Sequence, residues 1–219
     1  MIFRDRIEAG RILAQYLRQY ANRPDVVVLA LPRGGVPVAY PVAEALNAPL
    51  DIIIVQKLGA PGQEELAIGA IASGGVRVIN QRVVQHLGTS QEEVDAITSR
   101  ERQELERRER LYRDNRQPVD VKHRIVVLID DGLATGSSIR AAVAALRQKG
   151  PKQIVAAVPV ASESTCEELR NEVDHVVCAM TPVPFFAVGQ WYHDFSPTQD
   201  EEVRELLGRA AARQSSRAA

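Results

Sequence analysis

Little in this sequence points to a nucleic acid or a membrane as the binding partner. Its 27 lysine and arginine residues nearly balance 28 aspartate and glutamate residues, so a net charge of -1 gives no general basic surface for nucleic acid. No apolar stretch approaches the length of a membrane span, and the charged N-terminal residues show no apolar core of a signal peptide. We therefore expect a cytoplasmic protein whose partner is a small molecule.

Cysteine is also scarce, and the two copies show no metal-binding or redox pattern. Cys166 and Cys178 are twelve residues apart, and neither belongs to a Cys-x-x-Cys motif or lies at metal-ligand spacing from a histidine. This pattern favours reduced thiols that fill space in the core as small hydrophobic residues.

Runs of β-branched residues alternate with helical patterns along the chain. Strands are predicted at 26–31, 51–55, 125–129 and 153–160, and helices at 5–20, 36–46 and 138–148. The strands are continuous apolar runs, which is typical of strands covered on both faces. This alternation predicts an α/β fold with a mostly parallel central sheet flanked by helices, and 219 residues suffice for one such domain.

Two segments interrupt this alternation. Residues 57–75 are rich in glycine and lead into valines and isoleucines at 76–79, which predict the far arm of a hairpin. Residues 90–114 predict a long charged helix that begins with a capping box of Ser90 and Glu93. Its apolar stripe is thin, so we expect a mostly solvated helix at the rim of the domain. A contact with a partner or a second copy is the alternative.

The most informative stretch is IVVLIDDGLATGSS at residues 125–138. A buried strand ends on Asp130 and Asp131, and small residues then lead into a helix. In a parallel α/β sheet, ligands bind beyond the carboxyl ends of the strands, and unpaired N–H groups at a helix start attract an anion. The chain lacks both Gly-x-x-x-x-Gly-Lys-Ser/Thr and Gly-x-Gly-x-x-Gly, so this stretch predicts a different kind of phosphate loop.

The two acids narrow the choice of ligand. Carboxylates repel a phosphate, but they accept hydrogen bonds from sugar hydroxyls and bind divalent cations. A phosphate loop directly after Asp130 and Asp131 therefore indicates a sugar phosphate. The alternative is an ordinary helix start with two incidental acids, which would add charge repulsion without a structural gain.

This stretch resembles the phosphoribosyl-pyrophosphate (PRPP) signature of the type I phosphoribosyltransferases, in which an aliphatic strand, two acids and a short Thr/Gly/Ser loop follow one another. The resemblance extends over roughly residues 25–200 in the order of elements. It implies that Asp130 and Asp131 contact the ribose hydroxyls and that the loop after them wraps the 5-phosphate. The residues of that loop are Ala134, Thr135, Gly136, Ser137 and Ser138.

Two basic residues match positions that handle pyrophosphate in this family. The sequence LPRGG follows the first strand, where Arg33 would supply charge and Gly34 and Gly35 would let backbone N–H groups approach the ligand. A plain turn is the alternative. Lys57 stands at the end of the next strand, where it either reaches the pyrophosphate or is an ordinary solvated lysine.

The C-terminal segment resembles the hood of the 6-oxopurine phosphoribosyltransferases. By that resemblance Phe186 stacks on the acceptor base, Val188 offers backbone groups, Trp191 is a third acceptor contact, and Asp194 meets metal or pyrophosphate. A plain aromatic core is the alternative. The strand at 153–160 lacks the lysine that those enzymes use on the purine 6-oxygen, which leaves the acceptor open.

The resemblance implies one domain of the type I phosphoribosyltransferase fold over residues 1–219. Its expected parts are a lid hairpin at 57–80, a helical insertion at 81–118, a small hood at 180–200 and a disordered, polar tail at 209–219. Two-fold dimers are the common soluble assembly, so a homodimer is the expected form if the protein associates.

The implied activity is the Mg²⁺-dependent transfer of a 5-phosphoribosyl group from PRPP to a nitrogenous acceptor such as a nucleobase, with release of pyrophosphate. Asp130, Asp131, Arg33 and Lys57 are the expected catalytic residues. Asp130, Asp131 and Asp194 are the expected metal contacts, through ribose, pyrophosphate or water. The alternative function is a regulator of the same fold that binds PRPP or a nucleotide without turning it over.

Overall fold

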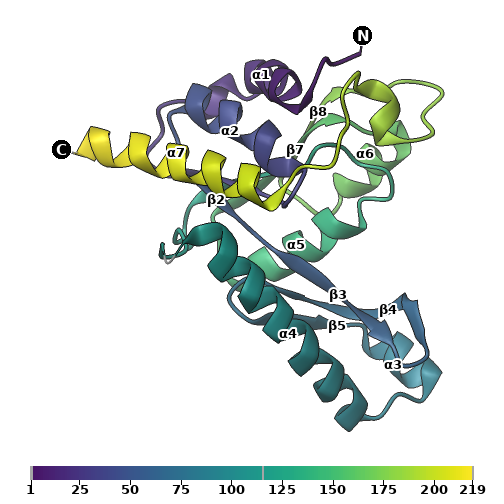
Figure 1. Ribbon diagram of the computed structural model, residues 1–219. Helices are drawn as coiled ribbons and strands as arrows, with labels where there is room; N and C mark the ends of the chain where they lie inside the picture. The colour runs from purple at the N-terminus through teal and green to yellow at the C-terminus, as the bar shows by residue number, and fades with distance from the viewer. Residues whose placement is uncertain (1, 115, 219) are drawn as a thin grey trace.

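A five-stranded parallel sheet forms the centre of the protein, as a computed structural model of residues 2–114 and 116–218 shows (Figure 1). The strands lie in the order β2-β1-β6-β7-β8, and every neighbouring pair is parallel. Their bounds are Val26–Ala30 (β1), Leu50–Ile52 (β2), Ile125–Ile129 (β6), Gln153–Val160 (β7) and His175–Met180 (β8). The predicted α/β class and parallel sheet are confirmed.

Helices cover both faces of this sheet because alternate side chains of each strand point to opposite sides. On one side, Val28 and Val127 pack in a cluster with α1 (Arg6–Tyr16), α2 (Gly35–Leu46) and α7 (Asp200–Ala218). On the other side, Val27 and Val126 pack against α5 (Ser137–Gln148) and α6 (Glu163–Leu169). The continuous apolar runs are therefore buried on both faces. A short 3-10 helix, η1 (Arg18–Tyr20), follows α1.

An arm extends from the end of the sheet that carries β2 (Figure 1). It contains the antiparallel strands β3 (Val55–Ala60), β4 (Gln63–Ala72) and β5 (Val76–Ile79), followed by α3 (Gln81–Leu87) and α4 (Gln91–Arg113). The predicted hairpin strand at 76–79 and the long helix are confirmed. The structure adds a long β3-β4 pairing within the segment for which the sequence indicated only a glycine-rich lid.

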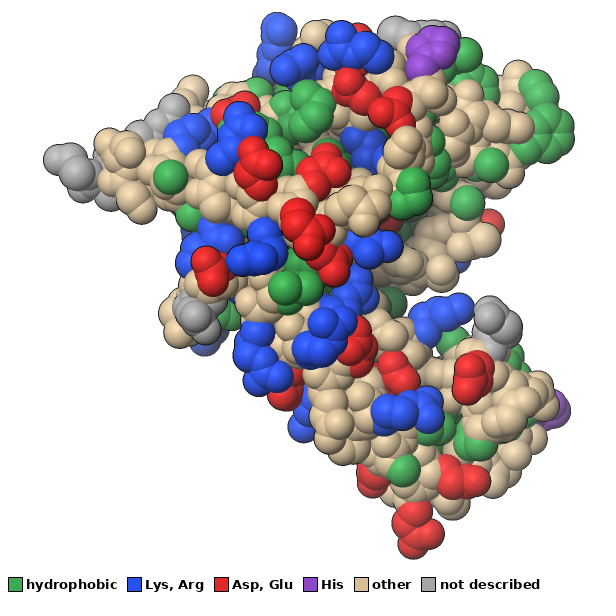
Figure 2. Space-filling view, viewed as in Figure 1, with side chains coloured by type: hydrophobic (Ala, Val, Ile, Leu, Met, Phe, Trp, Pro, Cys, Tyr) green, Lys and Arg blue, Asp and Glu red, His purple; other side chains and the backbone are tan. Residues whose placement is uncertain are grey.

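Helix α4 is largely solvated, as its thin apolar stripe predicts. Ser90 and Glu93 form the expected capping box at its start, and only a few side chains along its length are buried, among them Val94, Leu105 and Tyr112. Figure 2 shows lysine, arginine, aspartate and glutamate side chains interspersed along the outer faces of α4 and α7. Such mixed charge suits a surface in contact with water.

The base of the arm is fixed to the central sheet by a buried ion pair. Arg113, near the end of α4, donates from Nε to Asp51 Oδ1 at 2.9 Å and from Nη2 to the carbonyl oxygen of Ile52 at 2.8 Å. Glu109 accepts a further hydrogen bond from Arg113 at 2.6 Å, and Asp51 Oδ2 accepts from the N–H of Val119 at 2.9 Å. Both charges are thus paired and hydrogen-bonded, which is what a buried ion pair requires.

The chain end is helical, so the prediction of a disordered tail is wrong for residues 209–218. Helix α7 runs to Ala218 because its apolar residues Val203, Leu206 and Leu207 are buried in the core together with α2. Arg213 near its end donates to the carbonyl oxygen of Ala43 at 2.9 Å. The polar composition of the last residues concealed this packing face.

The prediction of reduced thiols is also wrong. Cys166 on α6 and Cys178 on β8 form a disulfide, which joins the helix to the edge strand that follows it. Cys166 is buried among hydrophobic residues, as expected, but its partner was not evident because the pairing depends on how α6 folds back on the sheet. No helix in residues 2–114 or 116–218 is long and apolar enough to cross a membrane.

We expect Asp51→Ala to destabilise the protein by about 3 kcal/mol, because it leaves the buried Arg113 guanidinium without its main partner. The measurement is the free energy of unfolding in urea. As a control, Glu205→Ala removes an exposed i,i+4 partner of Arg209 and should cost less than about 1 kcal/mol. Equal losses for the two variants would contradict the role given to the ion pair.

Candidate functional site

Two loops meet at the carboxyl edge of the sheet because β1 and β6 are neighbours in register, with Ala30 beside Ile129. The loop after β1 contains Gly34 and Gly35. A Cβ atom on Gly34 would overlap Oδ2 of Asp131, and one on Gly35 would lie 2.7 Å from the carbonyl oxygen of Ile129. The two loops therefore pack backbone against side chain, and glycine is required at both positions. The predicted pyrophosphate loop and acid pair are thus brought together.

Each acid of the pair has one oxygen engaged by the protein. The N–H of Asp131 donates to Asp130 Oδ1 at 2.9 Å, and Arg6 Nε donates to Asp131 Oδ2 at 2.9 Å. The other oxygens, Asp130 Oδ2 and Asp131 Oδ1, accept no hydrogen bond from the described residues, and neither is sealed from solvent without a partner. Each acid can therefore accept a hydrogen bond from a ligand.

The environment of the pair favours protonation. Burial raises the pKa of Asp130 well above its ordinary value, and the neighbouring charge of Asp131 raises it further. Burial also raises the pKa of Asp131, although the Arg6 guanidinium opposes this effect. Two adjacent, partly desolvated carboxylates are costly to the fold, which is typical of residues that serve a ligand rather than stability.

The loop after the acids presents unpaired backbone donors. Gly136 adopts a left-handed conformation, with φ of 70°, and precedes α5 as an N-cap without a side-chain hydrogen bond. Within the described residues, no group accepts a hydrogen bond from the N–H groups of residues 134–138. The hydroxyl of Thr165 holds this loop from below by donating to the carbonyl oxygen of Ala134 at 2.8 Å. The loop is therefore fixed while its N–H groups stay available to an anion.

A cavity of about 650 Å³ lies between this loop and the arm. Lys57 of β3 and Ser137 of α5 both line it, so these two predicted residues face the same space. Arg82 and Arg140 line it as well, and neither could be anticipated because they belong to no motif. Figure 2 shows the surface hollowed where the arm leaves the body of the molecule.

Arg33 lies on the other side of the pyrophosphate loop, next to α7. Its Nη1 is 3.5 Å from Asp200 Oδ1, and the hydroxyl of Tyr112 donates to the same oxygen at 2.6 Å. The Arg33 side chain is 46% exposed, so this long ion pair holds it weakly. The predicted pair of cations, Arg33 and Lys57, is not in direct contact.

The C-terminal segment joins the acid pair through some of the predicted hood residues. A Cβ on Gly132 would lie 2.5 Å from Val188, so Val188 packs directly on the residue after Asp131. Trp191, in the short helix η2 (Val188–Trp191), is half-buried. Phe186 is 76% exposed, so it is not the core residue that the alternative interpretation required.

Asp194 is the least integrated of the predicted residues. Its Oδ1 accepts a hydrogen bond from the N–H of Ser196 at 3.0 Å, and hydrogen bonding from the side chain and the N–H of Ser196 lowers its pKa. It lines a separate cavity of about 250 Å³ beside Arg6. In the part of the chain that the structure describes, no three acids, histidines or cysteines are grouped as metal ligands, so Asp130, Asp131 and Asp194 do not form a ready-made metal site.

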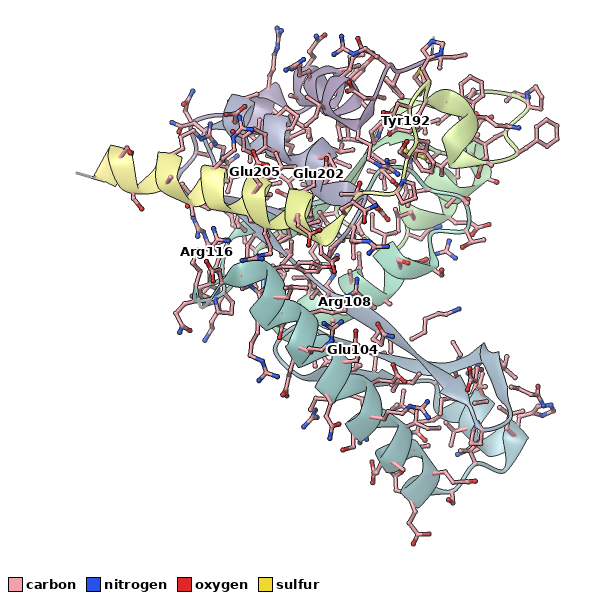
Figure 3. The ribbon with its side chains drawn as sticks, in the orientation of Figure 1. Glu104, Arg108, Arg116, Tyr192, Glu202 and Glu205 are labelled. Atoms are coloured by element: carbon pink, nitrogen blue, oxygen red, sulfur yellow. A yellow bond between two sulfur atoms is a disulfide. The ribbon has the colours of Figure 1, made fainter. Side chains whose placement is uncertain are left out.

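Arg6 and Tyr192 also belong to this site, although no motif in the sequence pointed to either. Arg6 pairs with Asp131, and the hydroxyl of Tyr192 donates to the carbonyl oxygen of Asp131 at 2.6 Å. Figure 3 shows Tyr192 in the hood segment, far from the labelled residues of α4. Neither residue lies near the acid pair in sequence, so only the assembled fold reveals these contacts.

Comparison with known proteins places this site in a family. Residues 4–190 match the family described as phosphoribosyl transferase domain, so the chain belongs to the phosphoribosyltransferase family. The fold agrees, because the crystal structure of TT1426 from Thermus thermophilus is similar with a TM-score of 0.84 and 42% sequence identity. That similarity covers 94% of this chain and 98% of the other.

Two curated relatives come from Mycobacterium tuberculosis. They are "Putative phosphoribosyl transferase Rv0571c" of strain H37Rv and "Putative phosphoribosyl transferase MT0597" of strain CDC 1551, each 46% identical over 209 residues. The match covers 95% of this chain and 47% of each relative. The chain thus spans about half the length of the curated relatives it matches.

The raised pKa of Asp130 predicts a pH-dependent effect of Asp130→Asn on stability. A folded-state pKa above the unfolded value of about 3.9 means that the folded protein loses stability as pH rises between the two values. Removing the carboxylate should therefore raise the melting temperature at pH 7, and this gain should shrink as pH falls toward about 4. A melting-temperature difference between variant and wild type that stays constant over this range would contradict the assignment.

Proposed function

We propose that this protein transfers the 5-phosphoribosyl group of PRPP to a nitrogenous acceptor, such as a nucleobase, and releases pyrophosphate. The observation that supports this most is the loop at residues 134–138, whose N–H groups are unpaired, beside two acids that each keep one oxygen without a partner. A phosphate on the loop and a sugar diol on the acids together describe a ribose phosphate.

The 5-phosphate is the part of the ligand that best suits the loop. Unpaired N–H groups at the start of α5 and the positive end of its dipole favour a dianion there. The side chains of Thr135, Ser137 and Ser138 are exposed and add hydroxyl donors around the same position. No lysine or arginine is needed in the loop, since several N–H donors share the charge.

The ribose would lie toward the acids. Its 2′ and 3′ hydroxyls can donate to Asp130 Oδ2 and Asp131 Oδ1, the two oxygens that the protein leaves available. In the transition state the sugar carries positive charge as pyrophosphate leaves, and nearby carboxylates stabilise it electrostatically. The acids therefore bind the hydroxyls and also favour bond cleavage.

Pyrophosphate would leave along the loop after β1. The N–H groups around Gly34 and Gly35 lie close to the acids, and the weakly held Arg33 side chain is available to pair with the departing oxygens. Lys57 faces the adjoining cavity from the arm, so a closing movement of the arm would bring a second cation toward the same group and exclude water.

Magnesium fits this arrangement as a companion of the substrate. Mg²⁺ usually keeps several waters and binds one or two carboxylates together with substrate phosphates, and Asp130 and Asp131 can supply these carboxylates. When bound, the ion would neutralise charge on the pyrophosphate oxygens. Asp194 would take part only through the ligand or water, because the described residues form no three-acid cluster.

The acceptor would bind on the hood side. Val188 packs against the start of the phosphate loop, Trp191 is half-buried next to it, and the ring of Phe186 is exposed and available for stacking. Strand β7 offers no lysine for a purine 6-oxygen, so a buried carbonyl at that position would lose about 1 to 3 kcal/mol.

The test is pyrophosphate release from PRPP and Mg²⁺ in the presence of a panel of nucleobases and other nitrogenous acceptors. The proposal predicts release that depends on one class of acceptor and on Mg²⁺. Binding of PRPP by calorimetry without release under any acceptor would favour the regulatory alternative. Absence of PRPP binding would contradict both functions.

Gly34→Ala should weaken PRPP binding at least about tenfold, because the added methyl group displaces the carboxylate of Asp131. The matched control is Gly208→Ala on α7, where an added Cβ has no neighbour within 4 Å and should leave PRPP affinity unchanged. Both affinities can be measured by calorimetry. Similar affinities for the two variants would count against the contact between Asp131 and the ribose.

A further inference from the structure

Arg6 connects the acid pair to the hood through three contacts. It is the first residue of α1, and its Nε donates to Asp131 Oδ2 at 2.9 Å. Its Nη1 donates to the carbonyl oxygen of Ser196 at 2.8 Å, and its guanidinium carbon lies 4.0 Å from the ring centroid of Phe195. Only 11% of the side chain is exposed, so these contacts replace most of its hydration.

Tyr192 holds the same acid from a second direction. Its hydroxyl donates to the backbone carbonyl of Asp131 at 2.6 Å, and its ring lies 5.1 Å from Phe195 and 5.3 Å from Phe3. The N-terminal residues also hold the segment, because Phe3 forms a parallel bridge with Tyr192. The segment 191–196 therefore contacts both the backbone and, through Arg6, the side chain of Asp131.

The geometry explains why an arginine is needed for this connection. A planar guanidinium can donate in two directions while its face stacks on an aromatic ring, and the compact ammonium of lysine cannot do all three. Arg6 uses Nε for Asp131, Nη1 for Ser196 and its face for Phe195. A movement of the Asp131 carboxylate must therefore be accompanied by a movement of the hood segment.

We infer that Arg6 is a positioning residue that couples the ribose-binding acid Asp131 to the hood segment 191–196, so that binding of PRPP orders the acceptor side of the site. The inference rests on the proposed function for the identity of the ligand. Fixing Asp131 against a ribose hydroxyl restricts Arg6, and Arg6 in turn restricts Phe195 and Ser196. A segment that is already ordered costs less to bind an acceptor.

This coupling is reciprocal. If PRPP strengthens acceptor binding, the acceptor must strengthen PRPP binding by the same factor, for which about 5-fold to 150-fold is the usual range. The site would then favour PRPP as the first substrate and the acceptor as the second. An enzyme that forms its acceptor pocket only after PRPP has bound does not trap the acceptor unproductively.

The chain has a single tryptophan, Trp191, which lies in the hood segment and reports on its order. The first experiment uses no ligand and measures acrylamide quenching of Trp191 fluorescence in Arg6→Gln, Asp131→Asn and the double variant. If Arg6 acts through Asp131, all three should show the same increase in quenching. Arg11→Gln, an exposed arginine on the same helix, is the matched control and should show none.

Additive effects of the two substitutions, or an unchanged Asp131→Asn variant, would overturn the inference. Arg6→Lys provides a second variant that retains the charge. It should restore part of the wild-type protection of Trp191, whereas a side chain that only fills space would give no such rescue.

The second experiment titrates PRPP with Mg²⁺ and follows heat and Trp191 fluorescence together. Wild type should show both signals, and Arg6→Gln should bind PRPP about fivefold or more weakly, with the fluorescence change lost. A full fluorescence change in Arg6→Gln would overturn the coupling. If wild type does not bind PRPP, the proposed function fails, while the ligand-free quenching still decides whether Arg6 links Asp131 to the hood.

Discussion

Unpaired main-chain N–H groups at the start of α5 are the feature on which the rest of this site depends. They exist because Gly136 takes a left-handed conformation and supplies no side chain to cap the helix. The parallel order of β1 and β6 then brings a second glycine loop against the same edge, where Gly34 lies directly on Asp131. Anion binding, diol binding and leaving-group binding thus follow from one junction of the sheet.

The cost of this junction is a pair of partly desolvated acids, and the structure offsets it with groups from distant parts of the chain. Arg6 and Tyr192 satisfy the side chain and the backbone of Asp131, and Thr165 fixes the loop through Ala134. The N-terminal helix, the hood and α6 are therefore supports of one site. The arm contributes Lys57 across a cavity and is fixed at its base by the buried Asp51–Arg113 pair.

The sequence predicted the parts of this site that are local and missed the parts that are not. Strand β6, the acid pair and the start of α5 were recognisable because aliphatic residues, carboxylates and small residues follow one another directly. Arg6 is 125 residues from Asp131, so no pattern in the chain could join them. The disulfide and the packing of α7 failed for the same reason, because both depend on which surfaces meet after folding.

The most direct test of the central claim is a titration of the ¹⁵N-labelled protein with ribose 5-phosphate, followed by the backbone amide signals. The account predicts that the amides of residues 135–138 show the largest, saturable shifts, because the phosphate accepts their hydrogen bonds. It also predicts that Asp131→Asn weakens the binding without moving these shifts elsewhere. Shifts confined to other parts of the chain, with the signals of residues 135–138 unchanged at saturation, would contradict it.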